Sequence, residues 1–213
     1  MSDLSRARER MVNIQIAGRG LRDSHVLQAM REVPREEFVA PELEAFAYED
    51  GPLPIDAGQT ISQPYIVAMM IESAEVSPGD RVLEVGAGSG YASAVLSRIA
   101  AKVYAIERHA ALAEAAQRRF VKLGYDNIEL RVGDGTRGWP EAAPFEAILV
   151  AASSPEVPRA FKEQLAIGGH LVLPVGERQW RQTLRKITRR GESEYEQDEL
   201  CAVAFVPLIG EQG

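Results

Sequence analysis

The stretch Glu84-Val85-Gly86-Ala87-Gly88-Ser89-Gly90 decides the fold, because it joins a strand pattern to a helix pattern. Residues 81–85 form a short apolar run of strand length, and Val95, Leu96 and Ile99 follow the glycines at helical spacing. Glycines at such a junction let the backbone turn tightly and approach a ligand without a Cβ clash. The stretch therefore predicts an α/β fold with a ligand-binding turn.

Strand and helix patterns alternate from residue 80 onward, which predicts right-handed crossovers and a parallel sheet covered on both faces. The tail differs, because residues 183–189 and 200–208 predict two strands without a helix between them, and such a pair can add an antiparallel edge. The other expected strands are 81–85, 102–106, 128–132, 145–151 and 170–175, and the expected helices include 109–123 and 156–167, the latter ending at Gly168-Gly169.

Prolines interrupt the helical patterns before residue 80. Asp23-Ser24 can cap a helix that Pro34 stops, and residues 35–61 are expected to be irregular. A second helix is expected after Ser62-Gln63, with Pro64 in its first turn. One α/β domain fits the whole chain, with a helical and substrate-loop extension over residues 1–79 and a ligand-binding core over residues 80–213.

Composition excludes several classes of protein. The 213 residues are 46% hydrophobic and 26% charged, which is typical of a globular domain. The net charge of −7 disfavours nucleic-acid binding, and the arginines at 181, 185, 189 and 190 favour a solvated strand face over an RNA patch. No apolar stretch approaches the roughly 20 residues that span a membrane, and the first residues lack the core of a signal peptide. With one cysteine, Cys201, the composition favours a cytoplasmic enzyme.

Acidic residues stand at the carboxyl ends of the expected strands. Glu107 closes the second strand, 17 residues after Gly90, and Asp134 follows the third. Ligands of open α/β sheets bind at that edge, where a carboxylate can accept hydrogen bonds from ribose hydroxyls. Because position 91 is Tyr, the spacing is G-x-G-x-G, and acidic strand ends suit S-adenosylmethionine better than the pyrophosphate of NAD. The alternative is a tight glycine turn with ordinary surface carboxylates.

The sequence also resembles the protein-L-isoaspartate O-methyltransferase family, from about Met11 to Gly210. The most specific part is Gly58-Gln59-Thr60-Ile61-Ser62-Gln63-Pro64-Tyr65. The other matching segments are Ala47-Tyr48-Glu49-Asp50, residues 86–91, Gly133-Asp134-Gly135 and Gly168-Gly169-His170-Leu171-Val172. The chain departs from the family pattern at Asp56, Glu146 and Ser153-Ser154.

The resemblance implies a Rossmann-like class I methyltransferase sheet, mostly parallel with an antiparallel C-terminal strand. It implies transfer of a methyl group from S-adenosyl-L-methionine to the free carboxylate of isoaspartyl residues in damaged proteins, with S-adenosyl-L-homocysteine as the product. The ester then closes to a succinimide, whose hydrolysis returns part of the material to aspartate. The expected partners are isoaspartyl proteins and peptides. We expect the protein to be a monomer, and we expect no metal ion in its site.

Residue roles follow from the resemblance and from the strand-end argument together. The resemblance places Ser62 at the reaction centre, where its hydroxyl is expected to orient the substrate carboxylate. Because that carboxylate is ionised at neutral pH, no strong general base is needed, and Ser62 is not expected to act as a nucleophile. Capping of the following helix is the alternative role for Ser62. Ile61, Gln63 and Tyr65 are expected to line the substrate groove, although packing is the simpler role for Ile61 and Tyr65. The expected cofactor-binding residues are Thr60, Ser62, Glu84, Gly86, Gly88, Gly90, Glu107, Arg108, Asp134 and Gly135, the last two at the adenine.

Other functions stay open at this point. A methyltransferase acting on small molecules or RNA is one, although residues 151–155 lack the Asn/Asp-Pro-Pro-aromatic pattern of amino-directed nucleic-acid enzymes. A catalytically silent module that senses damaged protein is another. His25, His109 and His170 have no metal-ligand spacing, and Cys201 is expected to be a packing residue.

Overall fold

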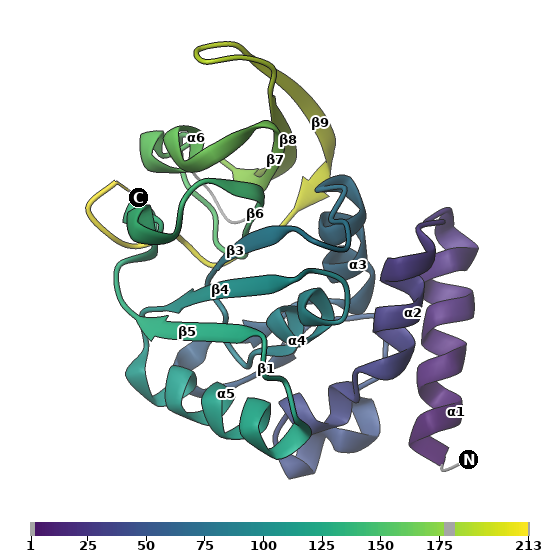
Figure 1. Cartoon of the computed structure of the whole chain (residues 1–213). Coiled ribbons are helices and arrows are strands. Elements are labelled where there is room, and N and C mark those ends of the chain that lie inside the picture. The colour runs from purple at the N-terminus through teal and green to yellow at the C-terminus, as the bar shows by residue number, and fades with distance from the viewer. Residues whose placement is uncertain (1–2, 177–181, 213) are drawn as a thin grey trace.

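A seven-stranded sheet forms the centre of the computed structural model, which describes residues 3–176 and 182–212 (Figure 1). Its strands are β3 (Arg81–Val85), β4 (Lys102–Glu107), β5 (Ile128–Val132), β6 (Phe145–Val150), β7 (Leu165–Val175), β8 (Gln182–Arg189) and β9 (Tyr195–Val203). They lie in the order β5-β4-β3-β6-β7-β8-β9, the first five parallel and the last two antiparallel to their neighbours. The predicted fold class is confirmed.

The helices of the core are α4 (Tyr91–Ser97), α5 (Ala110–Leu123) and α6 (Arg159–Gln164). Side chains alternate across each strand, so Val82 packs in the same apolar cluster as α4 and α5, whereas Leu83 packs in the cluster that contains Phe161 of α6. Figure 1 shows α4 and α5 on one side of the sheet and α6 on the other. Burial of both faces explains why the strands are nearly continuous apolar runs.

The N-terminal extension packs beside the core, at the right of Figure 1. The predicted cap is confirmed, because Asp23 accepts a hydrogen bond from the backbone N–H of Val26 at 2.9 Å. The predicted irregular stretch is confirmed as short elements. The elements are α1 (Asp3–Arg10), η1 (Met11–Ile16), η2 (Ala17–Arg19), α2 (Ser24–Glu32), η3 (Arg35–Phe38), η4 (Pro41–Phe46), β1 (Leu53–Pro54), η5 (Asp56–Gly58), β2 (Thr60–Ile61) and α3 (Pro64–Ser73). Two short turns, η6 (Gly135–Arg137) and η7 (Pro140–Ala142), follow β5.

The predicted helix 156–167 is too long at both ends, because α6 begins only at Arg159. Helix α6 ends at Gln164, and the chain enters β7 at once, so Gly168-Gly169 lies inside a strand instead of stopping a helix. The pairing with β6 is irregular here, and a Cβ on Gly169 would lie 2.7 Å from the carbonyl oxygen of Glu146. The glycine therefore serves a close approach of two backbones.

The predicted strand 200–208 is also displaced. Strand β9 begins at Tyr195 and ends at Val203, and residues 204–212 leave the sheet as a segment that we call the C-terminal strap. Two backbone hydrogen bonds join the strap to Ser153, in the loop after β6. The N–H of Ser153 donates to Val206 O at 2.8 Å, and the carbonyl of Ser153 accepts from Leu208 N at 2.7 Å. Of the arginines in the expected strand face, Arg181 lies outside the described residues.

Candidate active site

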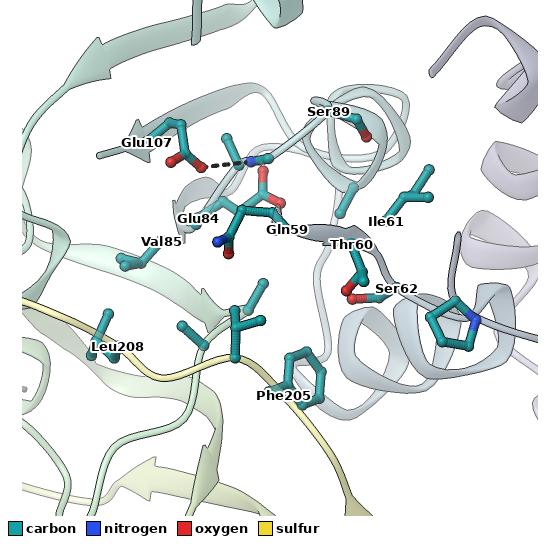
Figure 2. Close-up of a pocket in the computed structure, with 18 of the residues that line it drawn as sticks. Gln59, Thr60, Ile61, Ser62, Glu84, Val85, Ser89, Glu107, Phe205 and Leu208 are labelled. Atoms are coloured by element: carbon teal, nitrogen blue, oxygen red, sulfur yellow. Dashed lines mark hydrogen bonds between the residues drawn. The ribbon is translucent and has the colours of Figure 1, made fainter. Parts of the chain in front are cut away.

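A cavity of about 690 Å³ opens at the carboxyl ends of β3, β4 and β6. One wall is the glycine stretch, a second is the segment 58–63, and the third is the strap with the end of β9. Figure 2 shows side chains from all three walls around it, including Glu107, Ser62 and Phe205. The volume is in the range of sites that enclose a small organic ligand.

The glycine stretch lies between the strand and helix as predicted. Gly86 and Gly88 line the cavity, and the Gly86 N–H donates to Ile106 O at 2.8 Å. Gly90 does not line it. Its φ is +90° and a Cβ there would lie 2.7 Å from the Phe120 ring, so this glycine is required by helix packing.

Glu107 is the most firmly held acidic group of the cavity. Its side chain is 4% exposed, Oε2 accepts from Gly88 N at 2.8 Å (the dashed line in Figure 2), and Oε1 accepts from His109 N at 2.8 Å. Each carboxylate oxygen keeps a second lone pair for a ligand. Arg108, its neighbour in sequence, also lines the cavity.

Glu84 faces the cavity from inside β3 and is 2% exposed. Burial raises the pKa of Glu84 to about 8, the nearby Glu107 adds to this shift, and a hydrogen bond from the Ser93 hydroxyl opposes it. The carboxyl group is therefore largely protonated at neutral pH while no cation is bound.

The segment 58–63 brings Thr60, Ile61, Ser62 and Gln63 to the cavity wall. In the part of the chain that the structure describes, the Ser62 hydroxyl makes no hydrogen bond. The predicted capping role of Ser62 is wrong, because the N-cap of α3 is Gln63, whose side chain instead donates to Asp50 Oδ1 at 2.7 Å. The helix begins one residue later than capping by Ser62 requires.

Besides Gly90, two more predicted site residues, Tyr65 and Asp134, do not line the cavity. Tyr65 lies against Arg19, whose guanidinium carbon is 3.6 Å from the ring centroid. Asp134 accepts hydrogen bonds from the backbone N–H and the hydroxyl of Thr136, at 2.9 and 2.7 Å, and from Glu211 N of the strap at 2.9 Å. Gly135 lines the cavity beside it.

The strap is the part of the site that the sequence did not reveal. Residues 204–209 line the cavity, and Figure 2 shows Phe205 and Leu208 along one side of it. Pro207 was the available signal, because a proline inside an expected strand argues that pairing stops there. Gln59, Ala87, Ser89 and Tyr91 also line the cavity without having been predicted.

Two features are absent from residues 3–176 and 182–212. No group of three potential His, Cys, Asp or Glu ligands lies close enough together there to hold a metal ion. Within the same ranges, each helix is too short or too polar to cross a bilayer.

Comparisons with known proteins give one family. A family model described as protein-L-isoaspartate(D-aspartate) O-methyltransferase (PCMT) matches residues 6–213. Protein-L-isoaspartate O-methyltransferase 2 of Pelobacter propionicus is 56% identical over 206 residues, 97% of this chain and 92% of its own length. A protein-L-isoaspartate O-methyltransferase of Methylorubrum extorquens is 58% identical over 207 residues, 97% of this chain and 90% of its own.

Solved structures agree with the sequence comparisons. A protein-L-isoaspartate O-methyltransferase superposes with a TM-score of 0.86 and 31% identity, over 97% of this chain and 67% of its own. A beta-aspartate methyltransferase (PCMT) from Plasmodium falciparum, solved with S-adenosyl-L-homocysteine, superposes with a TM-score of 0.82 and 26% identity. The match covers 98% of this chain and 99% of the other. The predicted resemblance is confirmed: this chain belongs to the protein-L-isoaspartate(D-aspartate) O-methyltransferase family.

Proposed function

We propose that this protein transfers a methyl group from S-adenosyl-L-methionine to the free carboxylate of isoaspartyl residues in damaged proteins, which starts their repair through a succinimide. The observation that carries the proposal is that one cavity joins the glycine stretch and Glu107 to residues 58–63, which belong to the segment 58–65 on which the family resemblance rests. A relative solved with S-adenosyl-L-homocysteine supports the cofactor.

The residues of the cavity fit a nucleoside with a cationic amino-acid end. Glu107 offers lone pairs to ribose hydroxyls, and its orientation is already fixed by Gly88 and His109. Glu84 lies where an ammonium group would favour its ionised form. We assign the backbone of Gly86 and Gly88, with Thr60 and Arg108, to the remaining cofactor contacts, and Gly135 with its neighbour Asp134 to the adenine end. Ser62, which the sequence predicted at the cofactor as well, is assigned to the substrate.

The reaction depends mainly on how the substrate carboxylate is positioned against the methyl group. The bound cofactor supplies a methyl group on a positively charged sulfur. Ser62, Ile61 and Gln63 would hold the substrate carboxylate oxygen roughly 3–3.5 Å from that carbon, and the methyl group would pass from the sulfur to this oxygen. The substrate carboxylate is already ionised near neutral pH, so no side chain needs to remove a proton.

The residues of the cavity walls are assigned different roles in this reaction. Ser62 has a free hydroxyl among the described residues and is assigned to orient the carboxylate, while Ile61 and Gln63 form the adjacent groove. Tyr65 stays assigned to the outer substrate surface beside Arg19. Phe205 and Leu208 of the strap present apolar surface that excludes water. We also propose that the protein acts as a monomer in the cytoplasm, where its single cysteine stays reduced.

The test is transfer of radiolabelled methyl to a synthetic isoaspartyl peptide, with the matched aspartyl peptide as the control. We expect label in the isoaspartyl peptide alone, released slowly as the ester closes to the succinimide. Equal labelling of both peptides would contradict the substrate assignment. Binding of S-adenosyl-L-homocysteine with no label in either peptide would favour a different substrate or a silent binding module.

A further inference from the structure

Arg35 is a buried cation that the proposed reaction does not use directly. It stands at the start of η3 and is 0% exposed. Burial lowers the pKa of Arg35, and the charged or titratable groups that face it are Tyr91 and Tyr48. Among residues 3–176 and 182–212 no carboxylate lies within ion-pair distance of it, and its Nη1 has no hydrogen-bond partner. Burying a cation without a carboxylate partner carries a large desolvation penalty, so a purely structural role would not require an arginine here.

The two hydrogen bonds of Arg35 join segments far apart in sequence. Nε donates to Ala47 O at 2.8 Å, and Nη2 donates to Ser62 O at 2.9 Å. Its guanidinium carbon also lies 4.8 Å from the ring centroid of Tyr91, a residue of the cavity wall. The planar fork therefore connects the N-terminal extension to the residue proposed at the reaction centre.

Ser62 depends on this connection more than its neighbours do. Its side chain makes no hydrogen bond within the described ranges, so the position of its hydroxyl follows from its backbone. The neighbouring strand β2 has only two residues, paired with the two residues of β1. Sheet pairing so short is weak by itself, which leaves the arginine as a main constraint on the carbonyl of Ser62.

We propose that Arg35 is a positioning residue for methyl transfer: its guanidinium fixes the backbone of Ser62, and thereby the hydroxyl that meets the substrate carboxylate. The proposal rests on the function proposed above. It predicts that loss of Arg35 impairs the peptide side of the cavity and leaves the cofactor side intact, because Glu107 and Gly88 are held by bonds that do not involve it.

The experiment compares Arg35→Met and Arg35→Lys with a matched control, Arg8→Met. Arg8 also donates to two backbone carbonyls, Arg31 O at 3.1 Å and Glu32 O at 3.0 Å, and also has a buried nitrogen, Nε, without a partner among the described residues. It joins α1 to α2, also forms an ion pair with Glu36 at 3.6 Å, and lies outside the cavity wall. The readouts are kcat and KM for an isoaspartyl peptide, the Kd of S-adenosyl-L-homocysteine, and amide hydrogen exchange of residues 59–63.

We expect kcat/KM for the peptide to fall at least about tenfold in Arg35→Met, with the Kd within about twofold of wild type and faster exchange at residues 59–63. Arg35→Lys keeps the charge but replaces the planar fork with a compact ammonium group that cannot reproduce both bonds, so a smaller loss of about threefold is expected. This variant serves if Arg35→Met does not fold. Arg8→Met should change neither the kinetics nor this exchange by more than about twofold.

The proposal is overturned if the folded Arg35 variants keep wild-type exchange at residues 59–63. It is also overturned if kcat/KM falls only in proportion to the Kd, or if Arg8→Met has the same effect. If the wild-type protein itself labels no isoaspartyl peptide, the proposed function fails, and the exchange comparison still decides whether Arg35 holds Ser62.

Discussion

The two sides of the cavity are held in different ways. On the cofactor side, Gly86, Gly88 and Glu107 stand at the ends of adjacent parallel strands, and their bonds run to backbone groups of those same strand ends. On the substrate side, Ser62 and Gln63 lie between a two-residue strand and a helix, and side chains from distant segments, such as Arg35, hold them.

This difference explains which side is fixed in position before a ligand binds. The sheet fixes Glu107 before any ligand arrives, so ligand binding there orders little. On the other side, the Ser62 hydroxyl has no partner among the described residues, and a substrate carboxylate can take that place. We expect substitutions on the first side to change stability and cofactor affinity, and substitutions on the second to change turnover.

The largest effect is expected from Gly90→Ala, on the cofactor side. The new methyl group would lie 2.7 Å from the Phe120 ring with φ at +90°, so strain and overpacking should together cost about 3 kcal/mol of unfolding free energy. Gly124→Ala is the control: its φ is also positive, at +72°, but its Cβ would meet open space, and about 1 kcal/mol is expected. Equal losses in urea unfolding would show that Phe120 is not the cause.

Glu84→Gln should alter how stability depends on pH. The pKa of Glu84 in the folded protein is about 8, above its ordinary value of 4.5, so the folded state keeps a proton that the unfolded state releases. This contribution to stability is fully present below about pH 4.5 and is lost as pH rises toward 8. Between pH 6 and 8 wild type should lose about 2 kcal/mol more unfolding free energy than the variant. Parallel curves would mean that Glu84 is ionised in the folded protein.

The sequence predicted the cofactor side well because its signals are local. A strand pattern, a glycine turn and a carboxylate at the next strand end are enough to bring Gly88 and Glu107 together, since parallel strands share one edge. The sequence did not predict element boundaries that are set by contacts between distant residues. Nothing near Gln164 shows that the chain enters β7 there, because the close approach of Gly169 to Glu146 is a tertiary contact.

The substrate side was found by family resemblance and not by periodicity. Residues 58–63 have no regular pattern, and no local signal connects Arg35 to Ser62 across 27 positions. The strap was missed for a similar reason, because its path is set by Ser153 and Asp134, which lie far back in the chain. In both places contacts with distant segments, and not pairing within the seven-stranded sheet, set the path of the chain.

Ser62→Ala tests the substrate side directly. Without the hydroxyl, kcat for the isoaspartyl peptide should fall about tenfold, while the Kd of S-adenosyl-L-homocysteine stays within about twofold. Because Gln63 and not Ser62 is the N-cap of α3, unfolding free energy should change by less than about 0.5 kcal/mol, whereas a lost cap would cost about 1 kcal/mol. A wild-type kcat would remove Ser62 from the reaction centre.

The smallest effect is expected where the strap meets the cofactor side, at Asp134. Its carboxylate accepts from Glu211 N, so Asp134→Ala should release the strap and weaken S-adenosyl-L-homocysteine binding about threefold. Gly210→Ala keeps the carboxylate but would place a Cβ 2.0 Å from Asp134 Oδ1, which displaces the strap by sterics alone. We expect both variants to raise the Kd in calorimetry, and Gly191→Ala in the β8–β9 turn to leave it unchanged. If only Asp134→Ala raises it, the carboxylate contacts the adenine itself and the strap contributes nothing to affinity.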